Sequence, residues 1–322
     1  MLFRSEALNS SVAVKNISAG RTYLGNLADE TGTTKTIKTV ALSTLIAAAI
    51  VGNSLVVASV YKNTNKRMRV VSNYLVVNLS IADMFLAIFS LSRLIFFIHV
   101  GFEWPFVGGF GVFSCKAHNF FIVQLLFVST MNFMAIAIDR FVAVYFPFST
   151  VLKGKLLYFI ITATWVIPTC FFAFYWKMMN LEVRLGITVC YANVLAVFPT
   201  VEDFYDFQTA QGIILTGFTL AITVALYVAI GVKLFRRRLP GNQEENNVAQ
   251  SEVVARRVVR MMASVVLVFC ACWCPHWVLT TICTINPRQD VCRNPDARFV
   301  KYVVAYSNSA ITPFIYPLYS AN

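Results

Sequence analysis

The chain has 322 residues, of which 58% are hydrophobic, 14% aromatic and only 13% charged. This composition is too apolar for a soluble domain and indicates an integral membrane protein. A formal net charge of +12 would suit a nucleic-acid partner, but the basic residues lie in short runs between apolar segments. We therefore expect membrane lipid, and no nucleic acid, beside this chain.

Residues 1–36 form a polar segment without an apolar core of signal-peptide length. Two glycosylation sequons lie in it, at Asn9 and Asn16. A third sequon, at Asn78, falls inside an apolar span, where glycosylation is not expected. The segment is predicted to be a disordered extracellular tail that is glycosylated at Asn9 and Asn16.

Seven apolar stretches follow, each long enough to cross a hydrocarbon core of about 30 Å at about 1.5 Å per residue. Because the backbone has no other hydrogen-bond partner in lipid, such spans are expected to be α-helices. The predicted fold class is an all-α membrane protein, a seven-transmembrane helix bundle over residues 37–320. The helices are expected near residues 37–61, 71–98, 112–145, 155–176, 207–235, 258–284 and 299–319.

The distribution of basic residues predicts the orientation of the bundle. Lys and Arg are nearly balanced between the two sides, but they crowd the short loop that follows the first span and they bracket the loop after the fifth. Dense basic loops favour the cytoplasmic face. Together with the sequons, this favours a multi-pass protein of the plasma membrane with an extracellular N-terminus.

Asp83 lies midway along the second span, where a charge is costly and often marks function. Asn53, Ser129 and Asn308 are polar residues expected at similar depth in other spans. Such a group could hold water or a small cation, or it could be a hydrogen-bonded packing cluster. Both interpretations remain open from the residues alone.

Two arginines also fall within apolar spans. Arg93 lies about 15 Å nearer the outer surface than Asp83, where it would pair with an acidic ligand group or with Glu103, or would extend to the interface as a snorkelling side chain. Asp139 and Arg140 end the third span, and periodicity alone would make this arginine an ordinary interfacial residue.

Short motifs then occur in a fixed order along the chain. They are Gly52-Asn53, residues 78–83, Asp139-Arg140-Phe141, Trp165, Cys272-Trp273-Cys274-Pro275, and residues 308–316. Each motif is weak alone, but in this order and spacing the chain resembles the rhodopsin-like G-protein-coupled receptors from about residue 40 to 319. The resemblance implies a receptor that activates heterotrimeric G proteins through outward movement of helix six.

The resemblance also implies a role for individual residues. Arg140 would hold the inactive state near helix six and then contact the G protein, while Trp273 would repack beneath the ligand. Pro275 would kink the sixth helix, because proline frees a backbone carbonyl. The expected activation residues are Asp139, Arg140, Tyr227, Trp273, Pro275, Pro313 and Tyr316.

An allosteric sodium ion is the one cofactor that the resemblance implies. Its expected ligands are Asp83, Asn53, Ser129 and Asn308. Thr312 stands where the family carries an asparagine before Pro313, which weakens this expectation.

Cys115, at the outer start of the third span, and Cys190, in the second extracellular loop, match the disulfide pair of the family. The oxidising compartment permits this bond. Cys283 and Cys292 flank the last extracellular loop and are expected to form a second bridge.

The ligand pocket is expected among the outer halves of the helices. Its predicted residues are Arg93, Ile122, Leu126, His276, Trp277, Tyr302 and Tyr306. Ile122 replaces the aspartate of amine receptors, and Tyr306 replaces the retinal-binding lysine of opsins, so neither ligand is favoured. An acidic second extracellular loop favours a peptide. Arg93 leaves open an acidic lipid or another small molecule, and an orphan receptor with weak coupling is a further alternative.

Other functions have less support. The chain has three histidines, His99, His118 and His276, and none has a catalytic context, so no enzyme is expected. A transporter or channel would need a continuous polar path, which is not visible in the spans. The fifth span lacks the family's proline, and the chain ends at Asn322 without an eighth helix. That ending suggests an incomplete C-terminus or unusual cytoplasmic coupling.

Overall fold

The computed structural model describes residues 30–62, 71–101, 103–146, 154–184, 186–236, 245–286 and 289–320. Most of the predicted tail, including the sequons at Asn9 and Asn16, lies outside the described residues.

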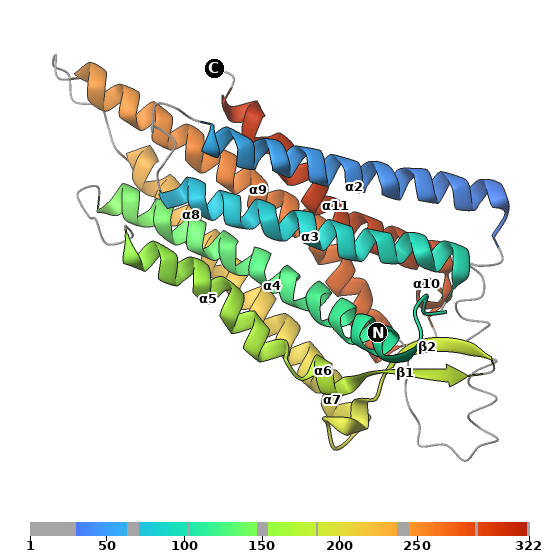
Figure 1. The fold of residues 1–322 in the computed structure, drawn as a ribbon. Helices are drawn as coiled ribbons and strands as arrows, with labels where there is room; N and C mark the ends of the chain where they lie inside the picture. Colours follow the sequence, from blue (N-terminus) through green and yellow to red (C-terminus); the bar gives the residue numbers. More distant parts are fainter. Residues whose placement is uncertain are drawn as a thin grey trace.

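Long helices lie side by side and form an elongated bundle (Figure 1). They are α2 (Gly32–Tyr61), α3 (Val71–Val100), α4 (Gly108–Tyr145), α5 (Lys155–Phe172), α8 (Thr219–Arg236), α9 (Glu245–Ile285) and α11 (Pro295–Ser320). Helix α2 begins before the predicted residue 37 because Thr31 caps it, with its side chain accepting a hydrogen bond from the backbone N–H of Thr34. The all-α membrane fold predicted from the sequence is confirmed.

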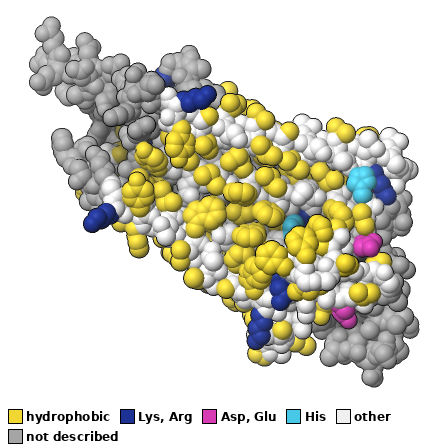
Figure 2. All heavy atoms as spheres, in the orientation of Figure 1, with side chains coloured by type: hydrophobic (Ala, Val, Ile, Leu, Met, Phe, Trp, Pro, Cys, Tyr) yellow, Lys and Arg dark blue, Asp and Glu magenta, His cyan; other side chains and the backbone are white. Residues whose placement is uncertain are grey.

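Five helices of the described chain are long and apolar enough to cross a membrane. They cover Gly32–Tyr61, Asn73–Val100, Gly108–Tyr145, Lys155–Met178 and Val259–Cys283, and a shorter apolar helix covers Thr219–Leu234. Helix α11 carries Asp296, Arg298 and Lys301 at its first turns, which lowers its hydropathy. Hydrophobic side chains spread over the length of the bundle (Figure 2), as expected for a surface that faces lipid.

The fifth predicted span consists of three consecutive pieces. Helix α7 (Val201–Gln211) begins at a capping box between Thr200 and Asp203, and a π-helical segment η2 (Gly212–Phe218) joins it to α8. The π-helical segment ends directly before Thr219, where the family's proline is absent. A π-helical turn inserts an extra residue into a helix and commonly lies at functional sites.

A β-hairpin that the sequence did not predict lies at the end of the bundle where α2 begins, which is the end predicted to face outward and is called the outer end below (Figure 1). After the short helix α6 (Tyr175–Met178), strand β1 (Met179–Arg184) pairs antiparallel with β2 (Ile187–Ala192). A disulfide joins Cys190 of β2 to Cys115 of α4. The 3-10 helix η1 (Val194–Ala196) then leads from the hairpin to α7.

A second disulfide joins Cys283 near the end of α9 to Cys292 in the short helix α10 (Asp290–Arg293). This bond closes the connection between α9 and α11. The structure thus contains both of the cysteine pairs expected from the sequence.

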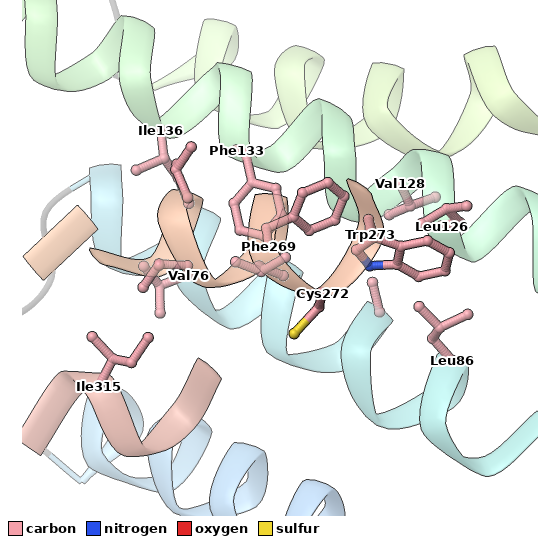
Figure 3. Close-up of a cluster of buried hydrophobic side chains, with 14 of the residues drawn as sticks. Val76, Leu86, Leu126, Val128, Phe133, Ile136, Phe269, Cys272, Trp273 and Ile315 are labelled. Atoms are coloured by element: carbon pink, nitrogen blue, oxygen red, sulfur yellow. The ribbon is translucent and has the colours of Figure 1, made fainter. Parts of the chain in front are cut away.

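The hydrophobic core runs along the bundle between α3, α4, α9 and α11. Figure 3 shows Phe133, Phe269 and Trp273 among its buried side chains. The Phe133 and Phe269 rings meet edge to face with centroids 4.8 Å apart, and Phe269 lies 6.0 Å from Trp273. Such contacts favour one packing arrangement over alternatives.

Candidate functional site

Five aromatic side chains from α9 and α11 meet in the outer half of the bundle. The His276 ring lies 5.5 Å from Trp273, 5.6 Å from Trp277 and 5.4 Å from Tyr302, and Trp273 lies 5.6 Å from Tyr306. Pro275 separates Trp273 from His276 within α9. The structure therefore brings together the predicted ligand residues of these two helices.

Three ring nitrogens of this aromatic cluster are buried without a hydrogen-bond partner among the described residues. They are Trp273 Nε1, His276 Nδ1 and Trp277 Nε1. Buried polar groups are normally paired, so unpaired ones mark places where water or a ligand completes the bonding. The two indole nitrogens can only donate, so they require acceptors.

The remaining predicted pocket residues on α4 differ in their surroundings. Leu126 is buried in the same hydrophobic core as Trp273 (Figure 3). Ile122 lies about one turn nearer the outer end and is half-buried. Leu126 therefore packs in the hydrophobic core beside Trp273 (Figure 3).

Arg93 lies apart from the α9 cluster, at the outer end of α3, against three aromatic rings. Its guanidinium carbon is 4.8 Å from the centroid of Trp104 and 5.7 Å from those of Phe96 and Phe97. Such cation–π contacts stabilise an arginine in an apolar setting. The ion pairs between described residues do not include the expected one between Arg93 and Glu103.

Two further polar side chains, which are not among the predicted ligand residues, lie near the pocket residues. The His118 ring packs edge-on against Trp104 at 5.6 Å. Lys301 donates to Thr280 Oγ1 at 3.3 Å and lies 4.7 Å above the Tyr302 ring. His118 follows Cys115 by about one helical turn, and this spacing is the signal that could have indicated it.

A buried polar cluster occupies the middle of the bundle, around Asp83. Ser129 Oγ donates to Asp83 Oδ1 at 2.9 Å. Four other buried oxygens have no hydrogen-bond partner among the described residues: Asp83 Oδ2, Asn53 Oδ1, Asn308 Oδ1 and Ser309 Oγ. Hard cations prefer oxygen ligands, so this donor set fits the sodium ion that the resemblance implies.

Hydrogen bonds within the cluster connect α2 to α11. Asn53 Nδ2 donates to the backbone oxygen of Ser309 and to that of Ala49, both at 2.9 Å. Thr312 Oγ1 donates to the backbone oxygen of Asn308 at 2.9 Å. Because its hydroxyl hydrogen is used within its own helix, Thr312 does not replace the amide of the usual asparagine.

Asp139 and Arg140 lie in the last turns of α4, near the end of the bundle that is predicted to face the cytoplasm. Asp139 Oδ2 is 3.5 Å from Arg140 Nε, and both side chains are mostly buried. Tyr227 is also buried, in α8. The ion pairs of the described chain connect Arg140 to Asp139 and not to helix six. The side chain of Tyr316 lies outside what the structure describes.

A contact between α4 and α8, which the sequence did not predict, lies between one and two helical turns after Arg140 along α4. Tyr145 Oη donates to the backbone oxygen of Ala229 at 3.0 Å. Lys233 Nζ lies 4.0 Å above the Tyr145 ring and donates to the Tyr145 backbone oxygen at 3.4 Å. Phe141 stacks on the Tyr145 ring at 4.2 Å. These contacts hold the inner ends of the two helices together.

The helix bundle, the outer aromatic cluster and the polar centre define a seven-helix receptor. The sequence profile of the 7 transmembrane receptor (rhodopsin family) matches residues 52–316. The chain therefore belongs to the rhodopsin family of seven-transmembrane receptors, as predicted, and it is a multi-pass membrane protein. The members of this family are receptors rather than enzymes.

Individual relatives share about a quarter of the residues. The Neuromedin-K receptor of Mus musculus is 27% identical over 281 residues, which are 84% of this chain and 58% of the relative. The Substance-P receptor of Cavia porcellus is 27% identical over 286 residues, 86% of this chain and 66% of the relative. The Substance-P receptor of Aquarana catesbeiana is 28% identical over 256 residues, 77% of this chain and 59% of the relative. The chain thus spans about three fifths of the length of these relatives.

Proposed function

We propose that this receptor binds an extracellular peptide and activates heterotrimeric G proteins by outward movement of helix six, which is α9. Relatives named for neuromedin K and substance P support a ligand of this class. The unpaired nitrogens of Trp273, His276 and Trp277 also support it, because peptide carbonyl groups supply the acceptors that these rings need.

A column of four rings is the observation on which the mechanism rests. It leads from His276 through Trp273 and Phe269 to Phe133, with centroids 5.5, 6.0 and 4.8 Å apart. A ligand that displaces His276 and Trp273 changes how Phe269 of α9 packs on Phe133 of α4. Because packed side chains exchange between discrete arrangements, the outer ligand can bias the inner end of α9.

Pro275 allows the outer and inner parts of α9 to move differently. It lies inside the helix, where it cannot donate a backbone hydrogen bond and where it bends the chain. In this proposal, movement of α9 opens the inner end of the bundle, and Arg140 leaves Asp139 to contact the G protein. Tyr227, Pro313 and Tyr316 would support the open state.

The cluster around Asp83 is proposed to hold an allosteric sodium ion. Asp83, Asn53, Ser129 and Asn308 would bind it through oxygen atoms, and the ion would balance the buried carboxylate. Since these residues come from α2, α3, α4 and α11, a cation shared among them would favour the compact, inactive bundle.

An extracellular N-terminus is also proposed. The disulfides Cys115–Cys190 and Cys283–Cys292 lie at the end of the bundle where α2 begins (Figure 1). Disulfides persist in oxidising compartments, so this end would face outward in the plasma membrane. Lys38 of α2 contacts Asp296 of α11 at 2.7 Å, close to Cys292, which agrees with this placement.

G-protein activation in cells tests the proposed function. The receptor, with a C-terminal tail added from a relative, would be exposed to panels of peptides, acidic lipids and amines, beside an Arg140→Ala variant. A peptide response that Arg140→Ala abolishes while peptide binding persists is the expected result. A response to an acidic lipid alone would favour the alternative ligand class, for which Arg93 is the supporting observation. Silence despite surface expression would contradict coupling.

A further inference from the structure

Two buried nitrogens without an acceptor lie against the same indole at the outer ends of α3 and α4. Arg93 Nη1 and His118 Nε2 have no hydrogen-bond partner among the described residues. The guanidinium carbon of Arg93 is 4.8 Å from the Trp104 ring centroid, and the His118 ring centroid is 5.6 Å from it. Each residue as a whole is only partly buried.

The Trp104 platform is held in place by several independent contacts. Its side-chain Nε1 donates to Ser114 Oγ at 3.0 Å, and its backbone N–H donates to the Thr188 oxygen at 2.7 Å. Ser114 precedes Cys115, whose disulfide to Cys190 joins α4 to the same hairpin that contains Thr188. Arg93 and His118 therefore contact a fixed ring, and their approach does not depend on a mobile loop.

No acidic side chain neutralises Arg93 within the described chain. The ion pairs there join Lys38 to Glu30 and Asp296, and Arg140 to Asp139. Cation–π contacts stabilise the guanidinium from its faces, but an aromatic ring does not replace an acceptor for the in-plane N–H groups. An ionisable group at membrane depth without a counter-ion marks a functional site by default.

We propose that Arg93 and His118 form a subsite for a carboxylate of the peptide ligand. This inference rests on the proposed function, because it assumes that the pocket binds a peptide. One carboxylate oxygen accepts from Arg93 and the other from His118, in the tautomer that carries hydrogen on Nε2. Both side chains contact Trp104, and Phe96, Phe97 and Phe89 make the surroundings apolar.

The chemistry of the site distinguishes a carboxylate from other anions and a peptide from a lipid. Two unpaired nitrogens match the two oxygens of a carboxylate, whereas a phosphate presents more charge and more acceptors than one cation can satisfy. A fatty acid would satisfy Arg93 and His118 but would leave the indole nitrogens of Trp273 and Trp277 without acceptors. A peptide satisfies both sets.

Thermal unfolding of the purified 322-residue chain in detergent tests the subsite. The probes are N-acetylphenylalanine and its primary amide, which differ only in the carboxylate, and a ligand of the folded state raises the Tm by mass action. We expect the acid to stabilise the wild type more than the amide does. Arg93→Gln should weaken binding of the acid about tenfold and remove its advantage, since one charge-assisted hydrogen bond disappears.

His118→Phe is the second variant, because it keeps the ring against Trp104 and removes the hydrogen-bond donor. If Arg93→Gln fails to fold, His118→Phe alone tests the proposal. Lys116→Gln, a half-buried cation on the same helix, is the matched control and should keep the preference for the acid. Equal stabilisation by acid and amide in the wild type, or a preference unchanged in both Arg93→Gln and His118→Phe, would overturn the proposal.

A second pair of probes, decanoate and decanamide, separates a peptide from a lipid source. Stabilisation by decanoate without stabilisation by N-acetylphenylalanine would overturn the peptide assignment. The measurement does not involve a G protein, so a failure of coupling leaves this result intact. Conversely, a receptor that couples normally but shows no preference for the carboxylate would refute the subsite alone.

Discussion

Gly52 of α2 lies directly against Pro313 of α11, and a Cβ atom at Gly52 would stand only 2.6 Å from Pro313 Cγ. Because neither the proline ring nor the two helix backbones can yield easily, Gly52→Ala should destabilise the receptor by roughly 1–3 kcal/mol. Thermal unfolding in detergent measures this. Gly231→Ala is the control, because a Cβ there meets nothing within 4 Å. An equal Tm for Gly52→Ala and wild type would contradict the close approach.

Sodium should stabilise the wild type relative to choline at the same chloride concentration. Asp83→Asn should abolish this difference, because the buried negative charge that attracts the cation disappears. Thr312→Val should retain it, since the Thr312 hydroxyl already bonds to the Asn308 backbone oxygen. The comparison is a Tm in NaCl against a Tm in choline chloride for each variant. Persistence of the sodium effect in Asp83→Asn would exclude the proposed ion site.

Tyr145→Phe should raise ligand-independent G-protein activation by about two- to tenfold. The substitution keeps the ring stacked on Phe141 and removes only the hydrogen bond to Ala229, which typically contributes about 0.5–1.5 kcal/mol. If that bond exists only in the closed state, its loss shifts the equilibrium toward the open state. Tyr158→Phe, at a residue 72% exposed on the lipid-facing surface, is the control. Basal activity unchanged by Tyr145→Phe would show that the contact is preserved on activation.

The two disulfides should differ in their contribution to stability. Cys115 and Cys190 are 75 residues apart, and Cys283 and Cys292 are 9 apart. In the chain-entropy description the longer loop contributes about 4.5 kcal/mol and the shorter about 2.5 kcal/mol. Replacing both cysteines of a pair by serine, followed by thermal unfolding, should therefore lower the Tm more for the Cys115–Cys190 pair. The opposite order would mean that the outer hairpin remains docked without its covalent link.

Several features of the fold were predictable because they depend on local composition. Helices in lipid must satisfy their own backbone, so long apolar stretches such as residues 37–61 and 112–145 predict helices without knowledge of their neighbours. The family followed from short motifs, among them Asp139-Arg140-Phe141 and Cys272-Trp273-Cys274-Pro275. The helices of the structure confirmed the predicted fold class, and the match to the family profile confirmed the predicted family.

Other features were not predictable because they arise from contacts between distant residues. Strand β1 alternates apolar and polar residues, but β2 is half-buried and has no clear alternation, and the hairpin depends on the pairing of the two strands and on the disulfide to α4. The π-helical segment before Thr219 also depends on a contact between distant residues. Gly212 packs against Trp277 of another helix, and a Cβ at Gly212 would lie 3.2 Å from that indole.

By itself, the sequence determined that this protein is an all-α membrane receptor, because apolar length and the order of motifs are properties of the chain alone. The tertiary structure decided which polar groups meet. It placed Arg93 and His118 against the same ring of Trp104, bonded Tyr145 to the backbone of Ala229, and left ring nitrogens of α9 without acceptors among the described residues. The physical reason is that burial and hydrogen bonding depend on the neighbours that packing supplies, and those neighbours come from other helices.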